Sequence, residues 1–339
     1  MLKKQTAPAS TGTIAGAPGA GLPRQATWRR LVGMRELAIL IVTLVVALLL
    51  SLTTTAFLNP SNLSAVAIGL VTDAVIAIAM TMVLITGGFD LSVGSVLAFA
   101  GMIVANRLHA GMDPVSAILL TLLAAGMVGL ANGLIITKVG VNPLITTLGM
   151  MGIASGMTLV LSGGYPVSNL PANFLFIGQG NLFGVPFSVV LTLVLVVIAD
   201  LLLRRAQWLR LLYYIGGNER AALLSGIPVD RVRTAVYIFC AVMAGLAGII
   251  ATSRLGSAFP LAGKGAELRV ISACVIGGCS LKGGEGTIIG SLLGVLLMAI
   301  INNGLVLLNV SIYWQSIVSG TILIAAVTFD MINQRRSHS

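Results

Sequence analysis

The sequence predicts an all-α polytopic membrane protein, from its composition, the length of its apolar runs and their lack of alternation. Apolar residues make up 57% of the chain and charged residues 9%, whereas a soluble domain carries roughly 25% charged residues. Apolar runs of about 20 residues are long enough, as helices, to cross a hydrocarbon core of about 30 Å. Only helices and closed barrels satisfy their backbone polar groups in lipid, and runs without period-two alternation favour helices.

Ten transmembrane helices are expected, bounded by Gly, Pro, Asn and charged residues. Asn142 followed by Pro143 suits a helix start, and so do Pro114 and Pro186. The eighth run is short and lies between glycines, so it fits a half-helix or a re-entrant segment. The predicted spans are 36–57, 63–86, 91–108, 115–138, 144–162, 187–205, 232–253, 267–280, 287–304 and 313–333.

The basic residues orient these spans. The net charge is +10, and in a membrane protein Lys and Arg gather in cytoplasmic segments. With the N-terminus in the cytoplasm, ten spans leave few basic residues on or near the outer side, namely Arg107, Arg254, Lys264 and Arg269. Both termini are therefore predicted to be cytoplasmic, and the positive charge requires no nucleic-acid partner.

The two ends of the chain differ from its apolar middle. Residues 1–34 are basic and rich in Ala, Gly, Thr and Pro, which predicts a flexible cytoplasmic tail. A transmembrane domain over 35–334 and a short cytoplasmic tail over 335–339 follow. A cleaved signal peptide is the alternative for the N-terminus, but it has a shorter basic region before its apolar core. The cysteines, Cys240, Cys274 and Cys279, suggest neither a disulfide framework nor a metal site.

Two glycine-rich segments resemble each other at an offset of 190 residues. Residues 87–94 read GGFDLSVG and residues 277–284 read GGCSLKGG. Both are predicted at cytoplasmic turns between two spans, in keeping with an internal repeat. Asp90 is expected to cap the third span rather than to touch a substrate. The predicted turn residues are Gly87, Gly88, Asp90, Gly94, Gly277, Gly278, Gly283 and Gly284.

The longest cytoplasmic loop, residues 206–231, is expected to contain a helix of about two turns. Asn218 suits its cap, Glu219 complements its N-terminus, and Gly226 with Pro228 ends it. One interpretation is an interfacial helix that only connects two spans. The other is a docking surface for a cytoplasmic partner, because the helix is short, rich in small residues and sharply delimited.

These segments resemble the ribose-type permease family of bacterial ABC importers. The resemblance rests on the loop, on residues 87–94 and 273–286, and on Asn302-Asn303-Gly304-Leu305. It implies the importer permease fold in the bacterial inner membrane, a second permease copy (identical or paralogous), cytoplasmic ATPase subunits and a periplasmic solute-binding protein. It also implies simple sugars such as pentoses as substrates. The helix that couples to the ATPase would be formed by Gly217, Asn218, Glu219, Arg220, Ala221, Ala222, Ser225 and Gly226.

The chain is not expected to be an enzyme. It contains no G-x-x-x-x-G-K-[ST] phosphate loop, so ATP and Mg are expected on a partner subunit and no cofactor on this chain. His109 and His338 lie in a loop and a tail, and no His, Ser and Asp constellation appears. The alternative function is an ion-coupled secondary transporter of a small polar solute, which would work without ATP or a partner.

Polar residues at membrane depth are candidates for the translocation pathway. Inserting a charge near the bilayer centre costs about 2.5–3.5 kcal/mol of free energy. Asp73, midway along the second span, is therefore expected to have a functional or structural role. With Thr72 it either lines the pathway or packs against a Ser, Thr or Asn of a neighbouring helix. Asn302 and Asn303 either bond between helices or line the same pathway.

At the predicted periplasmic mouth the sequence departs from the family in two places. Arg269 follows Glu267 and Leu268 where the family usually has an acidic residue, and Phe259 stands where it often has a polar amide. Both departures weaken an assignment to ribose. Glu267 and Arg269 do not share a helix face, so we expect each to pair with other helices or with the binding protein. Close helix packing is expected at Gly126, Gly129 and Gly133.

Overall fold

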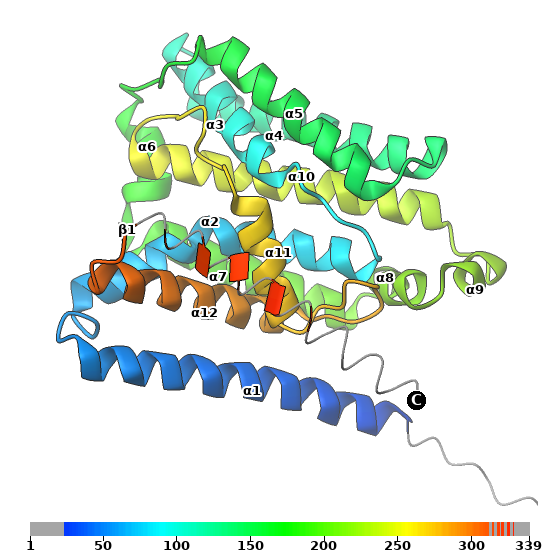
Figure 1. Ribbon diagram of the computed structural model, residues 1–339. Helices are drawn as coiled ribbons and strands as arrows, with labels where there is room; N and C mark the ends of the chain where they lie inside the picture. Colours follow the sequence, from blue (N-terminus) through cyan, green and yellow to red (C-terminus); the bar gives the residue numbers. More distant parts are fainter. Residues whose placement is uncertain are drawn as a thin grey trace, which may run out of the picture.

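The structure, a computed structural model, describes residues 24–311 and scattered positions between 314 and 328, with side chains from Arg35 onward. It is a helical bundle whose long members run along one common direction (Figure 1). In chain order the elements are α1 (Arg24–Thr53), α2 (Pro60–Ile85), α3 (Val93–His109), α4 (Pro114–Leu134), the π-helix η1 (Ile135–Val139), α5 (Pro143–Ser162), α6 (Ala172–Gln179), β1 (Asn181–Leu182), β2 (Val185–Pro186), α7 (Phe187–Arg205), α8 (Gln207–Gly217), α9 (Glu219–Leu224), α10 (Val229–Leu255), α11 (Ala266–Ile276) and α12 (Ile288–Leu307).

Seven helices in the described part of the chain are long and apolar enough to cross a membrane: α1, α2, α4 with η1, α5, α7, α10 and α12. The prediction of an all-α polytopic membrane protein is confirmed. The apolar helix α3 is shorter, with 17 residues. Helix α11 has 11 residues, about 16 Å and half of a hydrocarbon core, which agrees with a half-helix at the eighth run. The tenth predicted span, 313–333, lies mostly outside the described residues.

The predicted boundaries need correction at the N-terminus and in two loops. Helix α1 begins at Arg24, within the stretch predicted as a tail, and the flexibility of this stretch stays a prediction. Residues 1–23 and 335–339 lie outside the described residues. The sequence also gave no prediction of α6, of the two-residue strands β1 and β2, or of helix α8, which occupies the first half of the predicted loop.

Three long helices begin with the same local device, an amide or carboxylate cap followed by proline. The side chains of Asn59, Asp113 and Asn142 accept hydrogen bonds from backbone N–H groups of the first turns of α2, α4 and α5. Proline in the first turn costs no hydrogen bond, because that N–H has no partner inside the helix. The helix starts predicted at Pro114 and at Asn142-Pro143 are confirmed.

Helices α2 and α10 form the centre of the bundle. In α2, 72% of the apolar stretch is buried inside the protein, against 11% in α1. Helix α2 packs against α10, α11, α12 and α7, and α10 packs against α3 and α4. A Cβ atom on Gly129 would collide with the backbone of Tyr237, and one on Gly133 with that of Thr234. These glycines therefore permit the close approach of α4 to α10, as predicted.

Candidate functional site

Helices α8 and α9 project at one end of the bundle, where α10 begins (Figure 1). The chain breaks between them at Asn218, whose extended backbone ends α8 and whose side chain accepts a hydrogen bond from the N–H of Ala221 at 2.9 Å. Gly226 adopts a φ of 80° after the last turn, a conformation that favours glycine. The predicted capped helix is present, but it has six residues, and Gly217 belongs to α8.

Helix α9 presents two different faces. Ala222 is buried against Ile215 of α8 and Val229 of α10. Leu223 and Leu224 point outward, and Leu224 is 86% exposed. A large apolar side chain so exposed on a short, capped helix is a suitable contact for a protein partner. The side chains of Arg220 and Ser225 are also exposed.

An ion pair fixes α9 to the bundle. The guanidinium of Arg233 on α10 donates to both carboxylate oxygens of Glu219, each at 2.8 Å. The same guanidinium donates to the backbone carbonyl of Thr86, just after α2, at 3.3 Å. Displacement of α9 therefore acts directly on the start of α10 and the end of α2, the two central helices.

The two glycine-rich segments meet at this end of the bundle, next to α8. The N–H of Gly284 donates to the carbonyl of Ile85 at 2.8 Å. A Cβ atom on Gly283 would lie 2.8 Å from the backbone nitrogen of Gly87 and 3.0 Å from Cα of Gly216. A Cβ atom on Gly216 would in turn collide with the carbonyl of Ile85 and the N–H of Gly284. Three backbone segments, far apart in sequence, thus touch without intervening side chains.

The remaining predicted turn residues divide between this contact and other roles. Gly87 and Gly278 have positive φ angles, and Gly88 packs on the hydroxyl of Tyr237. Gly277 lies against the backbone of Gly290 on α12. The assignment of Gly94 to the turn is wrong, because Gly94 lies in the first turn of α3 against Gly263. The aligned glycines do not share a conformation, because Gly87 has a positive φ where its counterpart Gly277 has a φ of −64°. The internal repeat therefore stays a prediction.

Asp90 fixes the backbone conformation of the segment that leads into α3. Its side chain accepts hydrogen bonds from the backbone N–H and the hydroxyl of Ser92, and Asn132 of α4 donates to the same hydroxyl at 3.1 Å. Ser92, not Asp90, stands directly before α3, so the predicted cap is displaced by two residues. The carboxylate is fully buried, and burial raises the pKa of Asp90 from 3.8 to about 6, because desolvation disfavours the charged form.

A second polar site lies away from α9, around an ion pair between α2 and α11. The guanidinium of Arg269 donates to both oxygens of Asp73, at 3.1 and 3.2 Å. The two side chains are partly buried, with 37% and 22% exposed. Arg269 thus pairs with another helix, as expected. The alternative in which Ser, Thr or Asn satisfies Asp73 is wrong, because its partner is a cation.

The ion pair separates two cavities. One, of about 430 Å³, is also lined by Thr72, Arg254 and Phe259. The other, of about 290 Å³, is lined by Thr72, Asn302 and Asn303, and Asp73 and Arg269 border both. Thr72, Asp73, Asn302 and Asn303 thus gather in one region with Arg269. Glu267 lines neither cavity and lies against Gly94.

The two asparagines of α12 behave differently. Asn303 exchanges two hydrogen bonds with Asn62 of α2, at 3.0 and 2.8 Å, so it bonds between helices. Asn302 borders the smaller cavity. Asn303 lines the same cavity, so it combines the bond between helices with a place at the cavity. A role of either asparagine in translocation stays a prediction.

Comparison with known proteins gives the family. The family model "Branched-chain amino acid transport system / permease component" matches residues 62–327. The ribose import permease protein RbsC of Bacillus subtilis (strain 168) is 41% identical over 299 residues, covering 88% of this chain and 93% of the relative. The chain belongs to this permease family. The L-arabinose ABC transporter permease protein AraH of Azospirillum brasilense is 36% identical over 339 residues, covering 99% and 98%. No solved structure matches the permease.

The matched region of the permease begins in α2 and includes both polar sites, whereas α1 precedes it. Three functional candidates were not predicted from the sequence. Leu223 and Leu224 lie within the predicted helix, and the burial of Ala222 at the helix centre is what turns them outward. Arg254 was counted only as a charge of the outer side. It lines the larger cavity and donates to the carbonyl of Ile68 on α2 at 3.1 Å.

Proposed function

We propose that the chain is the membrane-spanning subunit of an ABC importer for a simple sugar, such as a pentose or a related polyhydroxylated solute, in the bacterial inner membrane. The relatives named for ribose and L-arabinose, which align with 81–99% of this chain, carry the proposal. The polar cavities beside Asp73 are consistent with it, because hydroxyl groups can exchange hydrogen bonds with Thr72, Asp73 and Asn302.

In this proposal the energy comes from partner subunits. The chain has no phosphate loop, so ATP and Mg would be bound by cytoplasmic ATPase subunits and hydrolysis would not occur on this chain. Helix α9 would dock on the ATPase through Leu223, Leu224 and Arg220, with Asn218 and Glu219 holding it rigid. A periplasmic binding protein would deliver the sugar, and a second permease copy would complete the pathway.

The topology that goes with this function has ten spans with both termini in the cytoplasm. It is supported by the distribution of Lys and Arg and by the position of α8 and α9, which project at one end of the described bundle. Phe259, Glu267 and Arg269 would then lie toward the periplasmic half. The larger cavity would receive the sugar, and the Asp73–Arg269 pair would stand between it and the smaller cavity.

Uptake by proteoliposomes tests this function against an ion-coupled transporter. Vesicles containing the permease, its ATPase and binding protein should accumulate labelled pentose only when ATP is present on the ATPase side. Vesicles containing the permease alone should show no accumulation under a proton or sodium gradient. Gradient-driven accumulation without ATP would replace the proposal with the ion-coupled alternative.

A further inference from the structure

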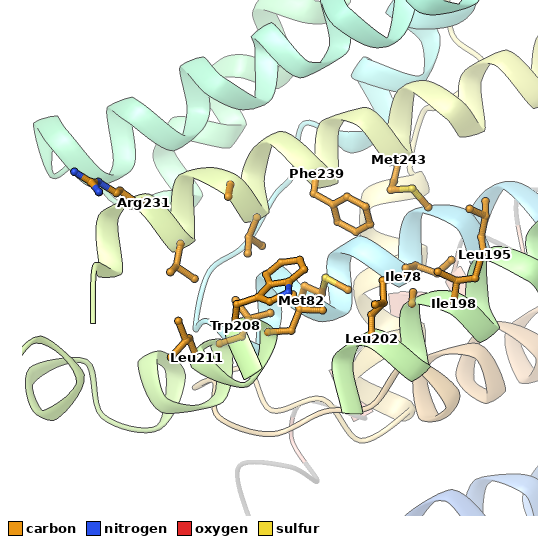
Figure 2. Close-up of a pocket in the computed structure, with 16 residues that line it drawn as sticks. Ile78, Met82, Leu195, Ile198, Leu202, Trp208, Leu211, Arg231, Phe239 and Met243 are labelled. Carbon is orange, nitrogen blue, oxygen red and sulfur yellow. The ribbon is translucent and has the colours of Figure 1, made fainter. Parts of the chain in front are cut away.

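A groove between α2, α7 and α10 is larger than either cavity beside Asp73, and it is apolar. Its volume is about 510 Å³, and Arg231 is the only charged residue among those that line it. Ile78 and Met82 of α2 form its floor. One wall comes from α7 and the other from α10, through Leu195, Ile198, Ala199 and Leu202 and through Val232, Ala235, Val236, Phe239 and Met243. Helix α8 closes one end with Trp208 and Leu211, as Figure 2 shows. Such a surface cannot satisfy the hydroxyl groups of a sugar.

The groove has the length of one membrane leaflet. It follows α10 from Arg231 to Met243, which at 1.5 Å per residue is about 18 Å. Half of a hydrocarbon core is about 15 Å. In the proposed topology, with α8 at the cytoplasmic surface, the groove begins at that surface and ends near the bilayer centre, the depth that one acyl chain of that leaflet occupies.

The surface end of the groove carries the groups that bind a lipid headgroup. Arg231 lines the groove, and Arg205 follows the lining residue Leu202 by three positions at the end of α7, on the same side of that helix. Both side chains are exposed and have no hydrogen-bond or ion-pair partner in the described part of the chain. Figure 2 shows Arg231 at the end of the groove where α10 begins, with its guanidinium directed away from the apolar side chains. Trp208, 64% exposed, stands at the same end, where tryptophan is enriched in membrane proteins.

We propose that the groove holds an acyl chain of an anionic phospholipid, with the phosphate near Arg231 and Arg205. Apolar walls of one-leaflet length fit the chain, and unpaired cations at the surface end fit the headgroup. The lipid site is independent of what the permease transports.

Native mass spectrometry of the detergent-purified full chain, incubated with phosphatidylglycerol or phosphatidylcholine, tests the site. The native chain should retain phosphatidylglycerol more strongly than phosphatidylcholine. Arg231→Gln should lower that preference about fivefold, the effect of one basic residue at an anionic surface. Lys264→Gln, an exposed charge outside the groove, should leave it unchanged.

A filling substitution gives a second readout. Ala235 is exposed within the groove, so Ala235→Trp should abolish retention of either lipid. Val197→Trp, on an exposed side of α7 outside the groove lining, should retain both, and equal melting temperatures of the two variants exclude misfolding. Equal retention of the two lipids by the native chain, or equal retention by the two Trp variants, would overturn the proposal. So would a disulfide-linked dimer through Trp208→Cys, which would place a second copy in the groove.

Discussion

Asp73 and Arg269 stabilise each other as an ion pair between α2 and α11. Each is partly buried within an apolar helix bundle, and each has the other as its ion-pair partner. Removal of one charge leaves the other desolvated and unpaired, which is costlier than removal of both. The stability of this region therefore depends on the ion pair, whether or not the region belongs to the translocation pathway.

A double-mutant cycle on this pair measures that dependence. We expect Asp73→Asn and Arg269→Gln each to lower the free energy of unfolding in detergent by about 2 kcal/mol. The double variant should regain part of this loss, with a coupling energy of about 1–3 kcal/mol. Additive losses would show that the ion pair contributes nothing. If the pair also lines the pathway, the double variant recovers stability and still takes up sugar at an altered rate.

Asp90 makes stability depend on pH. Its pKa in the folded protein, about 6, lies above its ordinary value of 3.8, so the folded state favours the protonated form. Its stabilising contribution is fully present below about pH 4 and is lost as the pH rises through about 6, a change of about 3 kcal/mol. Asp90→Asn keeps the hydrogen-bond acceptor for Ser92 and removes the charge.

We therefore expect Asp90→Asn to flatten the decline in the free energy of unfolding between pH 4 and 7, and to make the protein more stable than the native chain at pH 7.5. Denaturant unfolding across this pH range measures both effects. Asp113→Asn, at the exposed cap of α4, is the matched control and should retain the native decline. A native decline in the Asp90 variant would contradict the assignment.

At the scale of elements, α8 and the two glycine-rich segments form one contact at which backbones touch directly. Gly216 and Gly217 are adjacent in α8 and differ in one respect. A Cβ atom on Gly216 would collide with Ile85 and Gly284, whereas one on Gly217 would meet nothing within 4 Å. The pair is a controlled test of whether this contact matters.

Gly216→Ala should destabilise the permease by about 1–3 kcal/mol, the usual cost of overpacking, and should reduce sugar uptake because α8 is pushed away from the end of α2. Gly217→Ala should leave stability unchanged or raise it slightly, since alanine favours helix. Thermal unfolding and uptake measured side by side give the comparison. Equal effects of the two substitutions would mean that the contact is not tight in the working protein.

At the scale of the whole molecule, local signals predicted most of the fold. Helix starts such as Asn142-Pro143 and the cap at Asn218 depend on hydrogen bonds between residues at most four positions apart. Such local patterns can be recognised directly in the sequence. Helix α8 could have been predicted too, because Leu209, Leu212 and Ile215 recur every three residues and are all buried. The shortness of the loop's second helix and the outward direction of Leu224 depend on packing against α10.

Contacts between residues far apart in the chain could not be predicted from the sequence. Asp73 and Arg269 are 196 residues apart, and nothing in either helix alone indicates which charge faces which. The contact between the two glycine-rich segments is similar, because their resemblance predicts a repeat but not that the copies touch. The roles of both sites in transport are proposed from the family relationship, and the uptake and hydrolysis measurements test them.

Helix α9, in the proposed importer, transmits the work of a separate ATPase to the permease. The most direct measurement is sugar-stimulated ATP hydrolysis by the assembled importer with its binding protein, for Leu224→Ser and for Leu58→Ser, an exposed leucine in the α1–α2 loop. We predict that Leu224→Ser lowers the stimulated rate about tenfold, the effect of losing one central interface contact of about 1.4 kcal/mol, while Leu58→Ser leaves it unchanged. A native rate with Leu224→Ser would contradict this role of α9.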